Sequence, residues 1–159
     1  MANELLYFDD LSVGDTFSSG THAVSAEDIK RFAGEFDPQP FHLDDAAARK
    51  TIFGGLAASG WHTAAITMRL LATGGPRLAN GIIGAGGDIE WKMPTRPGDV
   101  LHVESEVVEL IASRSRPNRG VLVLRARTLT QRGDVVQTLT AKLMLDRRVE
   151  AAVAATEGA

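Results

Sequence analysis

The chain has 159 residues, with 17 Lys or Arg, 20 Asp or Glu, a formal net charge of −3 and no Cys. This length suits one domain with a full hydrophobic core, and the absence of Cys excludes disulfides, a thiolate nucleophile and zinc-finger spacing. Acids and bases are interspersed, the N-terminus lacks a signal-peptide pattern, and no apolar run approaches the ~20 residues of a membrane span, so we expect a cytoplasmic protein that binds neither nucleic acid nor membrane.

The first predicted elements are a strand over residues 16–24 and a helix that starts after Ser25. The strand segment contains Thr, Phe and Val, which favour extended backbone. Ser25 is a suitable N-cap with an acidic residue three positions later, which is close to a capping box, and the helix is expected to end near Glu35. A short helix is predicted over residues 44–50, because its acids come first and its bases last.

A proline-rich turn, residues 36–44 with the sequence FDPQPFHLD, separates these two helices. Pro38 and Pro40 fix φ and bias the residues before them away from helix, so we expect Asp37 and His42 to stand on a rigid extended turn. A carboxylate and an imidazole can hold one water molecule between them and move its protons near neutral pH. An ordinary turn with a structural His would produce the same spacing, and on spacing alone both interpretations stay open.

A long apolar helix is predicted over residues 57–72, with Arg69 as its only full charge and a Gly-Gly-Pro stop after it. A helix that is apolar on every side is a buried helix, and this one would span about 24 Å at ~1.5 Å per residue. The helix N-terminus favours an anion, and Gly60 would let an oxygen approach a backbone amide closely. Tight packing of the helix would explain the same glycine.

The pattern changes to strands in the second half of the chain, where β-branched residues alternate between turn signals. The glycine-rich segment 81–87 follows a helix and enters a strand, the reverse of a dinucleotide-binding loop, so a bulge is expected there. The four predicted strands cover about residues 82–92, 100–111, 120–131 and 134–145. The whole describes an α+β fold, an antiparallel sheet of about five strands wrapped around one long central helix, with one domain over residues 1–149 and a flexible tail over 150–159.

The segment from Phe32 to Gly60 also carries a recognisable motif. Its fixed positions are Phe32, Ala33, Asp37, Pro40, His42, Asp44 and Gly60. This motif resembles the signature of the MaoC-like dehydratases, the family of (R)-specific enoyl-CoA hydratases. Gln39 stands where that family usually has Asn, and Ser59 where it often has His. Residues 88–94 (DIEWKMP) and 96–99 (RPGD) match later pieces of the family pattern, and the resemblance covers most of residues 8–145.

The resemblance implies the hot-dog fold, a homodimer, and reversible addition of water to a trans-2-enoyl thioester, an acyl-CoA or an acyl carrier protein thioester, to give a 3-hydroxyacyl thioester, with (R) specificity. It implies that Asp37 and His42 handle the water, and the Gly60 amide would then meet the thioester oxygen. We expect no cofactor and no metal, because residues 42–45 lack a third ligand at useful spacing. A thioesterase on the same fold and a non-catalytic acyl-thioester binder remain alternatives.

Further side chains near the Asp and His are expected to contact the substrate. They are Phe36, Gln39, Phe41, Phe53, Ser59 and Trp61. Aromatic residues at such spacings often belong to an ordinary core. Trp61 is bulky and follows the proposed amide donor directly, so we expect it to shorten the acyl pocket. The remaining histidines, His22, His62 and His102, are expected to be partly buried structural residues.

Overall fold

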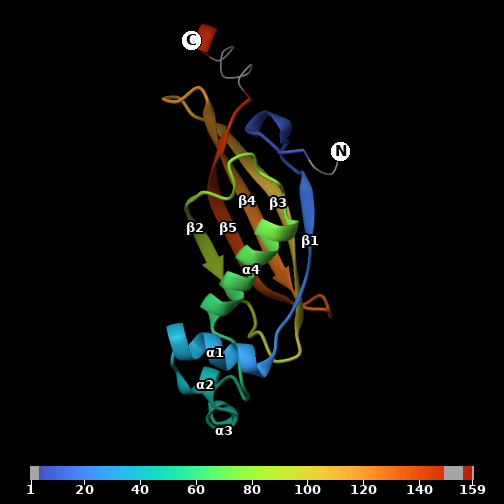
Figure 1. Ribbon diagram of the computed structural model, residues 1–159, viewed down its shortest axis with the longest axis vertical. Helices are drawn as coiled ribbons and strands as arrows, with labels where there is room; N and C mark the ends of the chain where they lie inside the picture. The colour runs from blue at the N-terminus through green and yellow to red at the C-terminus, as the bar shows by residue number, and fades with distance from the viewer. Residues whose placement is uncertain (1–3, 149–155, 159) are drawn as a thin grey trace.

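The computed structural model describes residues 4–148 and 156–158. Its strands are β1 (Thr16–Ala23), β2 (Gly84–Glu90), β3 (Val100–Ala112), β4 (Arg119–Leu129) and β5 (Val135–Asp146). Its helices are the 3₁₀ helix η1 (Phe8–Asp10), α1 (Ala26–Phe36), α2 (Pro40–Leu43), α3 (Asp45–Arg49) and α4 (Gly60–Gly74). The strands form one antiparallel sheet in the order β1-β3-β4-β5-β2, with α4 across one face and α1 to α3 gathered at one end (Figure 1). The predicted α+β architecture is confirmed.

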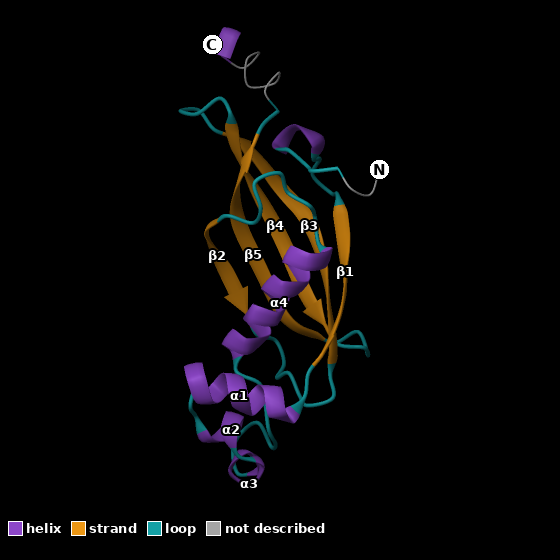
Figure 2. Cartoon of the chain, viewed as in Figure 1, coloured by secondary structure: helices purple, strands orange, loops and turns teal. Residues whose placement is uncertain are grey.

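Helix α4 lies across one face of the sheet (Figure 2), and the hydrophobic core lies between them. Inward-facing residues alternate along the central strands, as the two-residue period of a strand requires, with Leu101 and Val103 on β3 and Leu122 on β4. They pack with Leu70 and Leu71 of α4 in one buried cluster. Burying a side chain of this size stabilises the fold by roughly 1.5–3 kcal/mol relative to leaving it exposed.

Helix α4 is buried on one side only, so the prediction of a helix buried all round is wrong for the single chain. Its buried residues recur at helical spacing and are His62, Thr63, Ile66, Thr67, Leu70 and Leu71. The opposite side exposes Trp61 and Met68, at 60% and 43% of their surface. The sheet covers one face of the helix, and apolar composition alone does not reveal which face is left open.

The structure also shifts the start of α4, from the predicted residue 57 to Gly60. Residues 57–59 run as extended chain between two neighbours, because Ala57 N–H donates to the Phe41 carbonyl at 3.2 Å and Ala58 N–H to the Thr95 carbonyl at 2.9 Å. Ser59 is the N-cap, with its hydroxyl accepting from Trp61 N–H at 3.2 Å. The chain entering α4 is thereby fixed on both sides.

The predicted extended turn at residues 36–44 is only partly extended. Gln39 has extended φ and ψ of −105° and 144°, but Pro40 is the first residue of the short helix α2. Proline suits that position, because the first N–H of a helix has no intrahelical partner and the fixed φ is already helical. His42 therefore stands on a helical turn.

Several local predictions are confirmed. Ser25 caps α1, accepting a hydrogen bond from Asp28 N–H at 3.1 Å. The register of β2 against β5 shifts between Gly84 and Gly86, as a bulge requires. The predicted tail, residues 150–159, falls mainly on residues 150–155 and 159, which lie outside the described residues. Among those that are described, no helix is long and apolar enough to cross a membrane.

Candidate active site

His42 is buried at the end of α2 in a single ring orientation. Its side chain is 5% exposed, and its Nδ1 lies 2.6 Å from the Ala57 carbonyl oxygen. A carbonyl oxygen can only accept, so Nδ1 carries a proton and Nε2 is left for other partners. Phe41 packs against the ring in an edge-on contact, with centroids 4.5 Å apart. The ring is therefore held both by a hydrogen bond and by packing.

Asp37 faces the free nitrogen of that ring. It is the C-cap of α1, and its Oδ2 lies 3.3 Å from His42 Nε2. The Gln39 amide donates to the other carboxylate oxygen, Oδ1. The end of α1 and the start of α2 thus bring together the two side chains that the sequence singled out.

The environment of Asp37 favours its ionised form. Burial raises the pKa of the carboxyl, but hydrogen bonds from Ser59 and Gln39 and the neighbouring His42 ring together outweigh this, and the pKa lies below its usual value. Its side chain is 17% exposed, which is consistent with a carboxylate that is partly solvated. At neutral pH Asp37 is a proton acceptor.

The N-terminus of α4 supplies a backbone donor beside this pair. Trp61 N–H donates to the Ser59 hydroxyl, and the N–H groups of His62 and Thr63 donate to the Ser59 carbonyl. Among the described residues, Gly60 N–H has no hydrogen-bond acceptor. It lies at the positive end of the helix dipole, where an anion or a carbonyl oxygen binds favourably.

A cavity of about 300 Å³ joins His42 to the start of α4. Its lining includes His42, Phe53, Gly60, Thr63, Trp91 and Thr95. A larger hollow of about 430 Å³ lies beside β1, β3 and β4, lined by residues such as Glu104 and Arg127, and neither Asp37 nor His42 lines it. Within residues 4–148 and 156–158, no three His, Cys, Asp or Glu side chains come together as a metal site would need. The smaller cavity is the candidate site, because it contains the imidazole and the free amide.

The six side chains predicted to contact a substrate are placed in different ways. Phe53 lines the cavity. Phe41 packs against the His42 ring, and Gln39 and Ser59 form hydrogen bonds with Asp37. Phe36 and Trp61 do not line it, and their side chains are 68% and 60% exposed. Because Trp61 does not line the cavity, its side chain is not placed to shorten the pocket as we expected.

Trp91, Thr63 and Thr95 line the cavity, but sequence reasoning did not assign them to the site. Trp91 lies in a segment that resembles the family pattern, yet nothing in that segment indicates that its indole folds back onto the start of α4. Thr63 follows Gly60 at a spacing of three, which places both on one helix face, and this periodicity is the signal that could have found it.

Arg96 is a further residue that the sequence did not single out. Its guanidinium donates to the carbonyls of Gly55 at 2.8 Å and Leu56 at 3.2 Å, and also to the carbonyl of Phe53. These three carbonyls belong to the loop that ends at Ala57, whose own carbonyl binds His42. The arginine therefore fixes the loop that orients the imidazole.

Comparison with known proteins agrees with this arrangement. The family described as "MaoC like domain" matches residues 12–126. The chain belongs to the MaoC-like family. A MaoC-like dehydratase structure from Rhodospirillum rubrum is 62% identical, with a TM-score of 0.89 over 90% of this chain and 98% of that chain. The predicted family and the hot-dog fold are thus confirmed.

Two MaoC-like relatives carry names that state a reaction. The 3-hydroxybutyryl-CoA dehydratase of Methylorubrum extorquens is 35% identical over 113 residues, covering 70% of each chain. The (R)-specific enoyl-CoA hydratase of Rhodospirillum rubrum is 30% identical over 145 residues, covering 91% of this chain and 94% of that one. Their names support hydratase or dehydratase chemistry as the kind of reaction to consider for this site.

Proposed function

We propose that this protein catalyses reversible addition of water to a trans-2-enoyl thioester, giving an (R)-3-hydroxyacyl thioester. The observation that carries the proposal is one cavity lined by both His42, which is paired with Asp37, and Gly60, whose N–H is unpaired among the described residues. Relatives named 3-hydroxybutyryl-CoA dehydratase and (R)-specific enoyl-CoA hydratase support a coenzyme A thioester as the substrate, with an acyl carrier protein thioester as the other possible carrier.

Water is the reactant that suits a position beside the Asp37 and His42 pair, within reach of both. When the His42 ring is neutral, its Nε2 and the Oδ2 of ionised Asp37 are two acceptors 3.3 Å apart. A water molecule can donate one O–H to each of them, which leaves its lone pairs free to attack carbon. As the new bond forms, one of these protons passes to the pair. General base catalysis of this kind contributes roughly 10²–10⁴-fold to a rate.

The Gly60 N–H stabilises the enolate that forms when water attacks. When the water oxygen bonds to C3, the electrons of the C2–C3 double bond shift onto the thioester oxygen, and the resulting enolate then takes back at C2 the proton that the Asp37 and His42 pair received. A donor that already points at this oxygen binds the enolate more strongly than the neutral carbonyl. Losing one such donor typically costs about 10²–10³-fold in kcat.

The edge strand β2 supports a homodimer as the working unit. One side of β2 pairs with β5, and within the part of the chain that the structure describes no strand pairs with its other side. A free edge presents unpaired N–H and C=O groups, and pairing β2 of two copies about a two-fold axis would satisfy them. Light scattering after size-exclusion chromatography should give twice the chain mass, and a monomer would contradict this part of the proposal.

The decisive assay follows crotonyl-CoA by its enoyl absorbance, with a thiol reagent present to detect free coenzyme A. Hydration predicts loss of absorbance without thiol release, and chiral analysis should give the (R)-3-hydroxy product. Release of thiol would indicate a thioesterase instead. Absorbance that stays constant while crotonyl-CoA binds would indicate a non-catalytic binder.

Asp37→Asn tests the site itself. The amide keeps the shape of the side chain but cannot accept a proton, so turnover should fall by about 10²-fold or more while the circular dichroism spectrum is unchanged. Glu35→Gln is the matched control, because Glu35 is exposed at the end of the same helix and loses the same charge. Equal activity of the two variants would remove Asp37 from the mechanism.

A further inference from the structure

Four side chains from separate parts of the fold form one hydrogen-bonded network beneath the start of α4. Gln137 of β5 donates from Nε2 to the Thr67 hydroxyl at 3.0 Å and accepts at Oε1 from Trp91 Nε1 at 2.9 Å. The Thr67 hydroxyl also bonds the hydroxyl of Thr128, which lies directly opposite Gln137 in the pairing of β4 with β5. Gln137, Thr67 and Thr128 are fully buried.

The directions of these hydrogen bonds follow from chemistry. The Thr67 hydroxyl donates its one proton to the Thr63 carbonyl at 2.9 Å, so it must accept from both Gln137 and Thr128. The indole N–H of Trp91 can only donate. Rotating the Gln137 amide by 180° would place its NH₂ against the indole N–H and its oxygen against a hydroxyl with no proton left to give. The network therefore has one satisfied arrangement, which makes it rigid.

The same network presses the indole of Trp91 against Gly60. A Cβ atom built on Gly60 would lie 2.5 Å from Cε2 and 2.7 Å from Cδ2 of Trp91, distances that real Cβ atoms do not show. The residue with the free N–H thus has to be glycine here, because the indole occupies the space where a side chain would begin. Trp61 meets Trp91 edge-on at 5.3 Å and an angle of 82°, but on the exposed side of α4.

The cavity ends where this network begins. Among the described residues its lining reaches Thr63, three residues or ~4.5 Å beyond Gly60, but not Thr67. An acyl chain that extended further between α4 and the sheet would have to displace buried groups that already have their hydrogen bonds. Leaving such groups unpaired in the interior costs more free energy than the burial of a few methylenes returns.

We propose that Trp91, locked by Gln137, closes the acyl end of the site and restricts this protein to short-chain enoyl thioesters. The proposal rests on the proposed hydration activity and adds its chain-length limit. Trp91 acts by direct contact with the acyl group, whereas Gln137 is a positioning residue that acts through Trp91. The bulky residue that limits the pocket is then Trp91, after β2, and not Trp61 on α4.

The test compares kcat/KM for four-carbon, six-carbon and eight-carbon trans-2-enoyl-CoA. The unaltered protein should prefer the four-carbon substrate. In Trp91→Leu the ratio of eight-carbon to four-carbon kcat/KM should rise by roughly tenfold or more, since each methylene accommodated is worth about that factor. Trp61→Leu removes the neighbouring indole and is the comparison variant, for which the ratio should stay unchanged.

Gln137→Met supplies the second measurement and keeps the test informative if Trp91→Leu does not fold. Freed of its hydrogen bond, the indole should move, and the eight-carbon to four-carbon ratio should rise by a smaller factor with KM changing more than kcat. An unaltered protein that hydrates eight-carbon and four-carbon substrates equally well would overturn the chain-length limit but leave hydration standing. A protein that hydrates none of the three substrates would refute the proposed function instead. A ratio that rises in Trp61→Leu and not in the other two variants would also overturn the inference.

Discussion

The N-terminal half of α4 buries mainly polar side chains, with Ile66 as the aliphatic exception, whereas the C-terminal half buries aliphatic ones. Thr63 and Thr67 lie inside hydrogen-bonded networks, while Leu70 and Leu71 belong to the hydrophobic cluster. Buried hydroxyls add little net stability even when satisfied, and aliphatic burial adds more. The two halves of this helix therefore have different roles: the second half stabilises the fold, and the first half positions the site. The predictions below separate these two contributions.

The largest expected effect is a loss of turnover when the site beside the first half of α4 is altered. His42→Ala removes the ring that holds the attacking water, so kcat should fall by roughly 10²–10⁴-fold. The melting temperature should fall as well, because a buried ring and its hydrogen bond to the Ala57 carbonyl are lost, so kcat is expressed per folded molecule. Steady-state kinetics with crotonyl-CoA and a thermal melt measure the two quantities. A kcat that is retained, or that falls only because the protein unfolds, would contradict the placement of the active site beside the first half of α4.

Leu70→Ala should produce the reverse result in the second half. Deleting most of a buried leucine typically costs about 2–5 kcal/mol of unfolding free energy, because a cavity is left behind. Urea denaturation measures the loss, and kcat per folded molecule should be unchanged. Met68→Ala, on the exposed side of the same helix, is the control and should alter stability by only about 0.5 kcal/mol. Similar losses for the two variants would contradict the assignment of the core.

Ser59→Ala should have a smaller effect, a modest loss of stability together with a shift in the pH dependence of kcat/KM. The hydroxyl caps α4 and donates to Asp37, so its loss costs about 1 kcal/mol and raises the pKa of Asp37 toward its usual value. Because Asp37 must be ionised, the acid limb of kcat/KM should move to higher pH. Ser25→Ala removes a second N-cap, at α1, and should lose similar stability with no shift of that limb.

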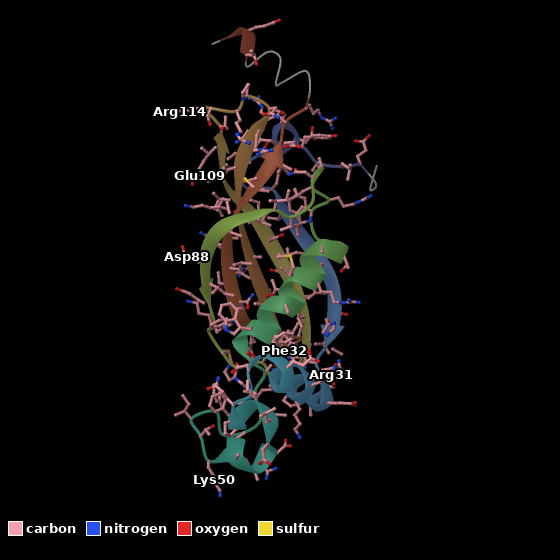
Figure 3. All side chains as sticks on the ribbon, turned by 60° about the vertical axis from the view of Figure 1, so that its left-hand side comes forward. Arg31, Phe32, Lys50, Asp88, Glu109 and Arg114 are labelled. Atoms are coloured by element: carbon pink, nitrogen blue, oxygen red, sulfur yellow. The ribbon has the colours of Figure 1, made fainter. Side chains whose placement is uncertain are left out.

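The smallest expected effect concerns His62, which is buried in α4 with its ring stacked on Phe32 at 4.6 Å; Figure 3 labels Phe32 where α1 meets α4. Burial lowers the pKa of His62, and within the described part of the chain its Nδ1 has no hydrogen-bond partner. The unfolded chain therefore binds a proton more readily, and stability should fall as pH drops below the ordinary histidine value of about 6.5.

His62→Phe keeps an aromatic ring against Phe32 but removes this titration. Its melting temperature should therefore depend less on pH between neutral and mildly acidic conditions than that of the unaltered protein. Thermal melts across that range measure the slope. The same slope in both proteins would mean that His62 is not the group responsible.

Much of the fold could be predicted because it depends on local signals. Turn residues, β-branched strands and the Ser25 cap each specify their own element, and the glycine-rich entry to β2 indicated its bulge. The full burial of α4 was predicted wrongly, because apolar composition does not say how many faces a sheet will cover. The turn before His42 became a helix, since Pro40 suits a first helical position as well as an extended one.

The site was predictable only where residues lie close in sequence or match the family motif. Asp37 and His42 are five positions apart, and the structure brings them within 3.3 Å. Arg96, Gln137 and Trp91 reach the site from distant segments, through contacts that depend on how the whole sheet is assembled. No periodicity in their own segments encodes that convergence. This is why the sequence did not predict that Arg96 fixes the loop behind His42 or that Trp91 borders the cavity.

The position of Trp91 gives the protein a built-in optical reporter. The chain has only two tryptophans, and they differ in their surroundings: Trp91 borders the cavity and Trp61 does not, although both are partly exposed, at 43% and 60%. In Trp61→Phe, the remaining indole emission would come from the wall that an incoming acyl group touches. Ligand entry could then be followed by fluorescence in a stopped-flow instrument without any attached dye.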